Sequence, residues 1–165
     1  MQEIEFSGKK RYLSNMYKCE IETREDMNFG IDLPTHLWQS SEHIYQFFKS
    51  KDKRWQLRIL NETEPKVTKN MASKFIPDTY KLSNEWDSNM KKYVMRIALY
   101  LKFSQNEELY SRLKKEVGPI IEKNYWGDVF WGECKGRGMN FLGKYLMEIR
   151  DTGLEVYKNN LKNYN

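Results

Sequence analysis

The sequence predicts an α+β fold that is predominantly α-helical, with a small antiparallel β-sheet from the N-terminal region. Up to about residue 40, apolar residues alternate with polar ones, which is the period of half-buried strands. Beyond that point, apolar residues recur every three or four positions, as they do on helices. The chain has 165 residues, and 39% of them are hydrophobic. This length and composition suit one hydrophobic core, so we expect a single domain over residues 1–165.

The expected strands are short. Gly8, Gly30 and Pro34 interrupt the N-terminal alternation, and such residues commonly mark turns. Three apolar pairs mark the strands: Ile4 with Phe6, Cys19 with Ile21, and Phe29 with Ile31.

The helical part begins at Ser40, a residue type that suits the N-cap position. The longest helix is expected over 84–103, where the apolar residues form one broad stripe. Ser104 and Glu107 have the spacing of a capping box, in which two side chains bond free backbone N–H groups at a helix start. The predicted helices are 40–50, 52–61, one after Thr63 with Pro65 in its first turn, 84–103, one opening at 104–107, and one from about Asn140 to just before Gly153.

The first helix carries a row of polar side chains. Glu42, Tyr45, Gln46 and Lys49 are spaced so that they share one helical face, and together they could grip a polar ligand. A structural interpretation is also open, because a glutamate in a first turn often only complements the helix dipole, worth roughly 0.3–1 kcal/mol. Similarly, Ser14 and Asn15 form a polar turn that could bind a ligand or simply close on its own backbone.

A glycine-rich segment connects Asn124 to Asn140, and connections of this length usually act as lids or binding loops. It places Asp128 beside Trp131, whose indole could stack on a base. Gly138 and Asn140 lead directly into a helix, where backbone N–H groups can bind a phosphate. The same residues could equally form a turn that Asn140 caps.

The net charge of +5 favours a negatively charged partner, although a solvated surface would carry the same charge. The cysteines, Cys19 and Cys134, and the histidines, His36 and His43, show no metal-binding spacing, so we expect no metal and no cofactor. The sequence shows neither a signal peptide nor an apolar run of membrane-spanning length. We therefore expect a cytoplasmic protein with no membrane partner.

Several motifs in this order resemble those of the NADAR family, from about residue 6 to residue 150. The matching residues are Leu13-Ser14-Asn15 with Tyr17; Ser41-Glu42-His43 with Tyr45-Gln46 and Lys49; Trp86-Asp87 with Met90; Lys102-Phe103; Asp128 with Trp131-Gly132; and Gly138 with Asn140, Leu142-Gly143, Leu146-Met147 and Arg150.

This resemblance implies hydrolysis of the bond between a base and a ribose. Family substrates include ADP-ribose attached to guanine in DNA and phosphoribosyl intermediates of riboflavin synthesis. We expect removal of ADP-ribose from ADP-ribosylated guanine in nucleic acid; the alternatives are the riboflavin-type reaction and a non-catalytic module that binds ADP-ribose or NAD. The expected catalytic residues are Glu42, Asp128 and Lys49, and the expected substrate-binding residues are Ser14, Asn15, Tyr45, Gln46, Trp86, Trp131, Gly132, Gly138 and Asn140.

The chain also departs from the family pattern. Met16 and Lys18 stand where the family often has Phe and Pro, and a common Gly-Arg pair is replaced near Phe75-Ile76. If that arginine holds a phosphate, this protein must use another cation or another substrate.

Overall fold

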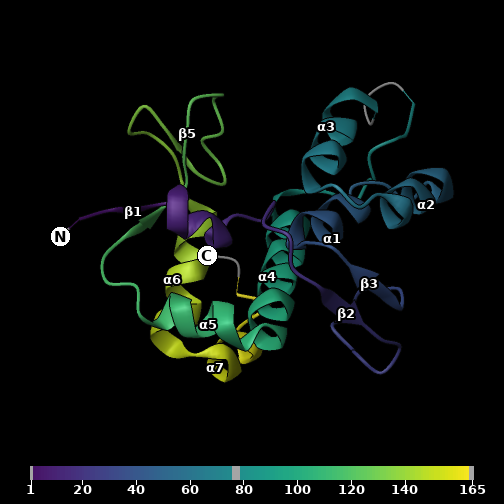
Figure 1. Cartoon of the computed structure of the whole chain (residues 1–165). Coiled ribbons are helices and arrows are strands. Elements are labelled where there is room, and N and C mark those ends of the chain that lie inside the picture. The colour runs from purple at the N-terminus through teal and green to yellow at the C-terminus, as the bar shows by residue number, and fades with distance from the viewer. Residues whose placement is uncertain (1, 76–78, 164–165) are drawn as a thin grey trace.

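The structure, a computed structural model, describes residues 2–75 and 79–163 and is built mainly of helices (Figure 1). The helices are η1 (Gly8–Leu13, a 3-10 helix), α1 (Ser41–Phe47), α2 (Lys53–Asn61), α3 (Pro65–Phe75), α4 (Ser88–Gln105), α5 (Glu107–Lys114), α6 (Phe141–Thr152) and α7 (Leu154–Asn159). The strands are β1 (Ile4–Glu5), β2 (Ile21–Thr23), β3 (His36–Trp38), β4 (Ile120–Ile121), β5 (Lys123–Asn124) and β6 (Glu133–Cys134).

Helix α4 lies at the centre of the molecule, with α1 against it on one side and α5, α6 and α7 on the other (Figure 1). The helix starts at Ser88 rather than at 84, because the Asp87 side chain accepts a hydrogen bond from the Met90 N–H at 2.7 Å and caps it. More of α4 is buried than the predicted apolar stripe indicated. Residues 93–99 and 101–103 are all buried, as expected of a helix surrounded by other elements.

The N-terminal region supplies a small antiparallel sheet, as predicted. Strands β2 and β3 pair antiparallel, with Ile21 opposite Trp38. The predicted strand at 29–31 is wrong, because the chain there is irregular and the partner strand comes later, at 36–38. Strand β1 instead pairs in parallel with β4, more than a hundred residues away in the sequence. Local alternation carries no information about so distant a partner.

The predicted capping box is also wrong. Ser104 lies in the last turn of α4, where its hydroxyl donates to the Leu101 carbonyl at 3.3 Å. Asn106 occupies the junction, and its side chain donates to the Lys102 carbonyl at 2.8 Å. The side chain therefore satisfies a free carbonyl at the end of α4 rather than an N–H group at the start of α5.

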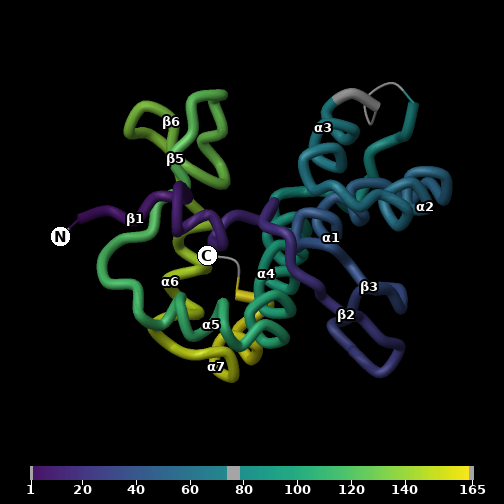
Figure 2. The backbone as a smooth tube through the Cα atoms, viewed as in Figure 1, coloured from purple at the N-terminus to yellow at the C-terminus, as the bar shows by residue number. Residues whose placement is uncertain are grey.

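The glycine-rich segment 124–140 is a loop with only short strand pairing, and it projects from the same side of the molecule as α3 (Figure 2). Helix α6 follows it, starting after Asn140 and ending before Gly153 as predicted. The six-residue α7 was not predicted. Within the described ranges, no helix is both long enough and apolar enough to span a membrane.

Candidate functional site

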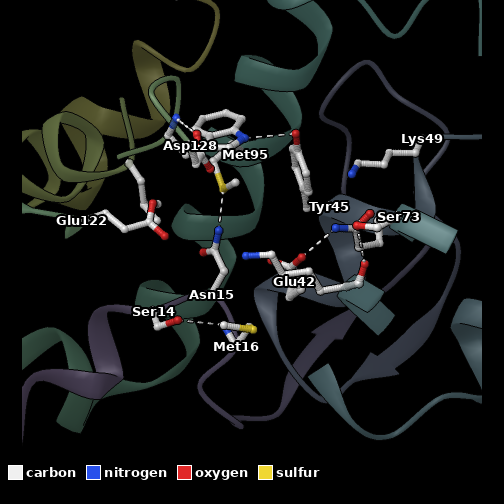
Figure 3. A pocket seen from close by; sticks show the side chains of 14 residues that line it. Ser14, Asn15, Met16, Glu42, Tyr45, Lys49, Ser73, Met95, Glu122 and Asp128 are labelled. Atoms are coloured by element: carbon white, nitrogen blue, oxygen red, sulfur yellow. Dashed lines mark hydrogen bonds between the residues drawn. The ribbon is translucent and has the colours of Figure 1, made fainter. Parts of the chain in front are cut away.

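A pocket of about 150 Å³ lies between α1, α3, α4, the turn after η1 and the glycine-rich loop (Figure 3). It collects side chains from segments that are more than a hundred residues apart in the sequence. The predicted site residues that line it are Glu42, Asp128, Lys49, Ser14, Asn15, Tyr45, Gln46 and Trp131.

Glu42 is the second residue of α1, and it is only 6% exposed. Its Oε1 accepts a hydrogen bond of 2.6 Å from Gln46 Nε2, one helical turn later. The other carboxylate oxygen, Oε2, has no hydrogen-bond partner among the residues that the structure describes. Gln46 thus orients the carboxylate and leaves one oxygen available to a ligand or a water molecule.

Lys102 of α4 holds the turn that carries Ser14 and Asn15 by hydrogen bonds to its backbone. The buried Lys102 ammonium donates to the carbonyls of Tyr12 at 2.6 Å and Ser14 at 2.8 Å. Burial lowers the pKa of Lys102 to about 8. Asn15 Oδ1 accepts from Ser41 Oγ at 3.0 Å. The turn therefore has a structural role and still presents its side chains to the pocket.

Aromatic rings form one wall of the pocket. Trp131 Nε1 donates to Tyr45 Oη at 3.2 Å, and the two rings meet edge to face with centroids 5.5 Å apart. Trp86 packs edge to face against the same tyrosine, with centroids 5.1 Å apart. Trp86 does not line the pocket, but it lines a neighbouring groove of about 640 Å³. Its contribution to the pocket is to hold Tyr45.

Lys49 lies just beyond the end of α1, with its Nζ 5.3 Å from the centroid of the Tyr45 ring. Burial lowers the pKa of Lys49, an effect that the nearby Glu42 carboxylate opposes. The four polar residues of the predicted face therefore all reach the pocket, although the helix ends two residues before Lys49.

Asp128 shapes the glycine-rich loop. Its Oδ1 accepts hydrogen bonds from the backbone N–H groups of Phe130 at 3.0 Å and Trp131 at 2.9 Å. The Asp128 N–H in turn donates to Asn124 Oδ1 at 3.0 Å. One carboxylate thus organises the turn that delivers Trp131 to the pocket while lining the pocket itself.

The end of the loop does not offer its backbone to a phosphate. The N–H groups of residues 139–142 all donate to loop carbonyls, at distances of 2.7–3.3 Å. Asn140 does not cap the helix with its side chain; it bonds the Ile120 carbonyl at 2.9 Å and the Glu122 N–H at 3.1 Å. Both interpretations of this segment therefore fail, because the loop uses these groups to close on itself and on the 120–122 segment.

Gly132 and Gly138 lie behind the pocket and permit close packing of backbones. A Cβ atom at Gly132 would come within 2.1 Å of the Glu122 carbonyl oxygen. A Cβ atom at Gly138 would come within 2.1 Å of the Gly132 carbonyl oxygen. Gly132 therefore lets the loop pack on the backbone of the 120–122 segment, and Gly138 lets the end of the loop pack on Gly132.

The sequence did not indicate several residues that line the pocket. Lys69 and Ser73 come from α3, and Glu122 comes from the segment between β4 and β5. Burial raises the pKa of Glu122 to about 7, and the carboxylates of Asp128 and Glu42 add to this effect. Lys69 provides a cation within the pocket, whereas the replaced Gly-Arg pair falls at Phe75-Ile76, and Ile76 lies outside the described residues. In the described part of the chain, no cluster of His, Cys, Asp and Glu could hold a metal ion.

The NADAR domain family model matches residues 5–152, which is most of the chain and includes every residue that lines the pocket. The chain belongs to the NADAR family. N-glycosidase YbiA of Escherichia coli strain K12 is 32% identical over 142 residues, covering 83% of this chain and 86% of that protein. The NMR structure of E. coli YbiA superposes with a TM-score of 0.74 at 28% identity, covering 95% of this chain and 87% of that one.

A further relative of this NADAR chain is riboflavin biosynthesis protein VVA0006 of Vibrio vulnificus, 28% identical over 148 residues. The match covers 85% of this chain and 35% of that protein. Together with the similarity to YbiA, NADAR membership makes the chain a hydrolase of the N-glycosidase type.

Proposed function

We propose that this NADAR protein removes ADP-ribose from ADP-ribosylated guanine in nucleic acid. The observation that carries the choice of substrate is a basic groove that adjoins the pocket. A nucleic acid strand continues on both sides of the modified base and needs a second binding surface, whereas a riboflavin-type intermediate is a single small molecule with no such strand.

The groove has a volume of about 530 Å³ and shares Ser14 and Met16 with the pocket. Among the described residues that line it, four are cationic and none is acidic: Lys9, Arg11, Lys18 and Arg112. Phe6 and Tyr17 line it as well, and both are partly buried against the core. Cationic side chains neutralise phosphates and aromatic rings stack on bases, which together suit a single strand.

Two of the four cations are free to bind phosphate. Lys18 is paired with Glu64, and Arg112 lies over the Tyr12 ring at 4.0 Å and donates to the Lys9 carbonyl. Lys9 and Arg11 have exposed side chains with no ion pair among the described residues. These two are therefore the residues to test.

The chemistry of the pocket supports cleavage of a ribose-to-base bond. Breaking this bond builds positive charge on the sugar, which a nearby carboxylate can stabilise. The unbonded oxygen of Glu42 suits a general base that activates water, and general base catalysis typically contributes about 10²–10⁴-fold. Lys49 and Asp128 lie in the same pocket, where they can hold the phosphate and the ribose hydroxyls or assist opening of the sugar ring. The Trp131 indole can pack against the base in this pocket.

The second candidate is cleavage of phosphoribosyl intermediates of riboflavin synthesis. The relatives that are named as riboflavin biosynthesis proteins favour it. Their matched segments are 35% and 12% of their own lengths, so most of each of those proteins has no counterpart in this chain.

The test offers the protein ADP-ribosylated guanine in single-stranded DNA, free ADP-ribosyl guanosine, and the aminopyrimidine phosphoribosyl intermediate. We expect release of ADP-ribose from the DNA with the highest kcat/KM. Turnover of the aminopyrimidine compound alone would select the second candidate. Binding of ADP-ribose with no turnover of any compound would indicate a binding module and overturn the proposal.

The double substitution Lys9→Glu with Arg11→Glu tests the groove directly. We expect kcat/KM for the modified DNA to fall and its salt dependence to weaken, with the log–log slope decreasing by roughly two, about one for each lost phosphate contact. Turnover of free ADP-ribosyl guanosine should not change. The control replaces Lys81 and Lys162, two exposed lysines away from pocket and groove, with glutamate. An equal loss in this control would show that net charge acts instead of the groove.

A further inference from the structure

We propose that Glu122 is the general acid of this pocket and donates a proton to the leaving base, opposite Glu42. The inference rests on the N-glycosidase activity and holds for either candidate substrate. It assigns a role to a residue that no motif in the sequence had indicated.

The geometry of Glu122 is that of a group aimed at a ligand. Its carboxyl group points into the pocket, which it lines together with Glu42 and Asp128 (Figure 3). Glu122 Oε2 is buried and has no hydrogen-bond partner within the described part of the chain. Buried polar atoms are nearly always satisfied in folded proteins, so this oxygen, which faces the pocket, is available to bond a substrate or a water molecule there.

Three contacts fix the position of the Glu122 backbone. Its N–H donates to Asn140 Oδ1 at 3.1 Å, and its carbonyl accepts from the Glu133 N–H at 2.8 Å. Gly132 packs directly on the same carbonyl. Catalytic groups need this kind of support, since small misplacements cost much of the rate. These contacts also explain why Gly132 and Asn140 are among the residues that match the NADAR motifs, although neither lines the pocket.

The charges around Glu122 favour its protonated form. Asp128 from the loop and Glu42 from α1 are like charges, while Lys69 from α3 opposes them and Lys49 lies further along the same pocket. Burial is the largest influence, and it raises the pKa of the Glu122 carboxyl to about 7. An acid whose pKa lies near the working pH donates its proton most effectively.

The proposed step balances in atoms and charge. The bond between C1′ and the base nitrogen breaks, and both electrons go to the nitrogen. The base takes the proton from the Glu122 carboxyl and leaves neutral. Water adds to C1′ and gives its proton to the Glu42 carboxylate. Proton exchange with solvent then restores a protonated Glu122 and an ionised Glu42, and the net reaction consumes one water molecule.

The experiment compares wild type, Glu122→Gln and Glu155→Gln across pH 5 to 9 on whichever substrate the wild type cleaves fastest. We expect kcat/KM of the wild type to decline above about pH 7, as Glu122 loses its proton. Glu122→Gln should lose about 10²-fold or more, and its remaining activity should lack this alkaline decline. The control Glu155→Gln changes an exposed carboxylate of α7, outside the pocket, and should match the wild type.

Thermal unfolding provides a second measurement that needs no substrate. A carboxyl whose folded pKa is raised binds its proton more tightly in the folded state, so its unfavourable effect on stability grows as pH rises from about 4.5 to about 7. Glu122→Gln should therefore unfold at a higher temperature than wild type at pH 8, with the difference shrinking toward pH 4.5. Activity within about threefold of wild type, or an equal loss at every pH with the alkaline decline retained, would overturn the assignment.

Discussion

Replacing Glu42 with glutamine is expected to lower kcat by about 10²–10⁴-fold, the usual contribution of a general base. Glutamine keeps the size of the side chain and can still accept the hydrogen bond from Gln46 Nε2 through its amide oxygen. The substitution therefore removes the negative charge and the basic oxygen while preserving the local packing. Steady-state kinetics on the preferred substrate, together with circular dichroism, would separate loss of chemistry from loss of fold.

A matched control exists for the structural interpretation of Glu42. Glu108 is the second residue of α5, as Glu42 is of α1, but it is exposed and lies outside the pocket. Glu108→Gln removes the same favourable interaction with a helix N-terminus, worth roughly 0.3–1 kcal/mol. It should cost a little stability and no activity. If Glu42→Gln behaved in the same way, Glu42 would be a helix-terminal residue and nothing more.

The largest expected loss of stability follows from Arg96→Met. The buried guanidinium pairs with both carboxylate oxygens of Glu148, at 2.6 and 2.8 Å, and donates to the Asn160 carbonyl at 3.0 Å. It thereby joins α4 to α6 and to the end of α7. The Glu148 carboxylate that is left behind is 27% exposed and can be partly hydrated, so we expect the loss of its partner to cost about 1–3 kcal/mol. Equilibrium unfolding in urea would measure this loss.

The double variant Arg96→Met with Glu148→Met tests whether the loss of stability comes from the broken ion pair or from altered packing of the Arg96 side chain. Replacing both partners by apolar side chains of similar volume is often neutral or stabilising, so the double variant should recover most of the free energy of unfolding lost in the single variant. If the two substitutions were instead additive, the ion pair would not be the source of the loss.

Much of the candidate site could be anticipated because its residues share a local spacing. Glu42, Tyr45, Gln46 and Lys49 follow the helical period, and the structure brings all four to one pocket. The glycine-rich loop was recognisable from its composition and length alone. The positions of the helices were likewise largely predictable, since apolar periodicity is a property of neighbouring residues.

Other predictions failed where a distant partner decided the outcome. The backbone N–H groups at the start of α6 looked available to a phosphate, but they donate hydrogen bonds to carbonyls of the preceding loop. Ser104 looked like an N-cap, but it lies in the last turn of α4, which ends at Gln105, and the side chain at the junction is that of Asn106. Strand β1 could not be paired correctly, since its partner β4 comes only after helices α1 to α5 in the sequence.

By itself, the sequence determined the fold class, the longest helices, the family and the polar face of the first helix that lines the pocket, because each of these depends on short-range periodicity or on ordered motifs. Only the tertiary structure decided that Glu122 joins Glu42 and Asp128, that Lys102 supports the Ser14 turn, and that Arg96 is buried in an ion pair. The physical reason is that the ionisation and orientation of these groups depend on burial and on long-range contacts. Such contacts leave no periodic pattern in the chain.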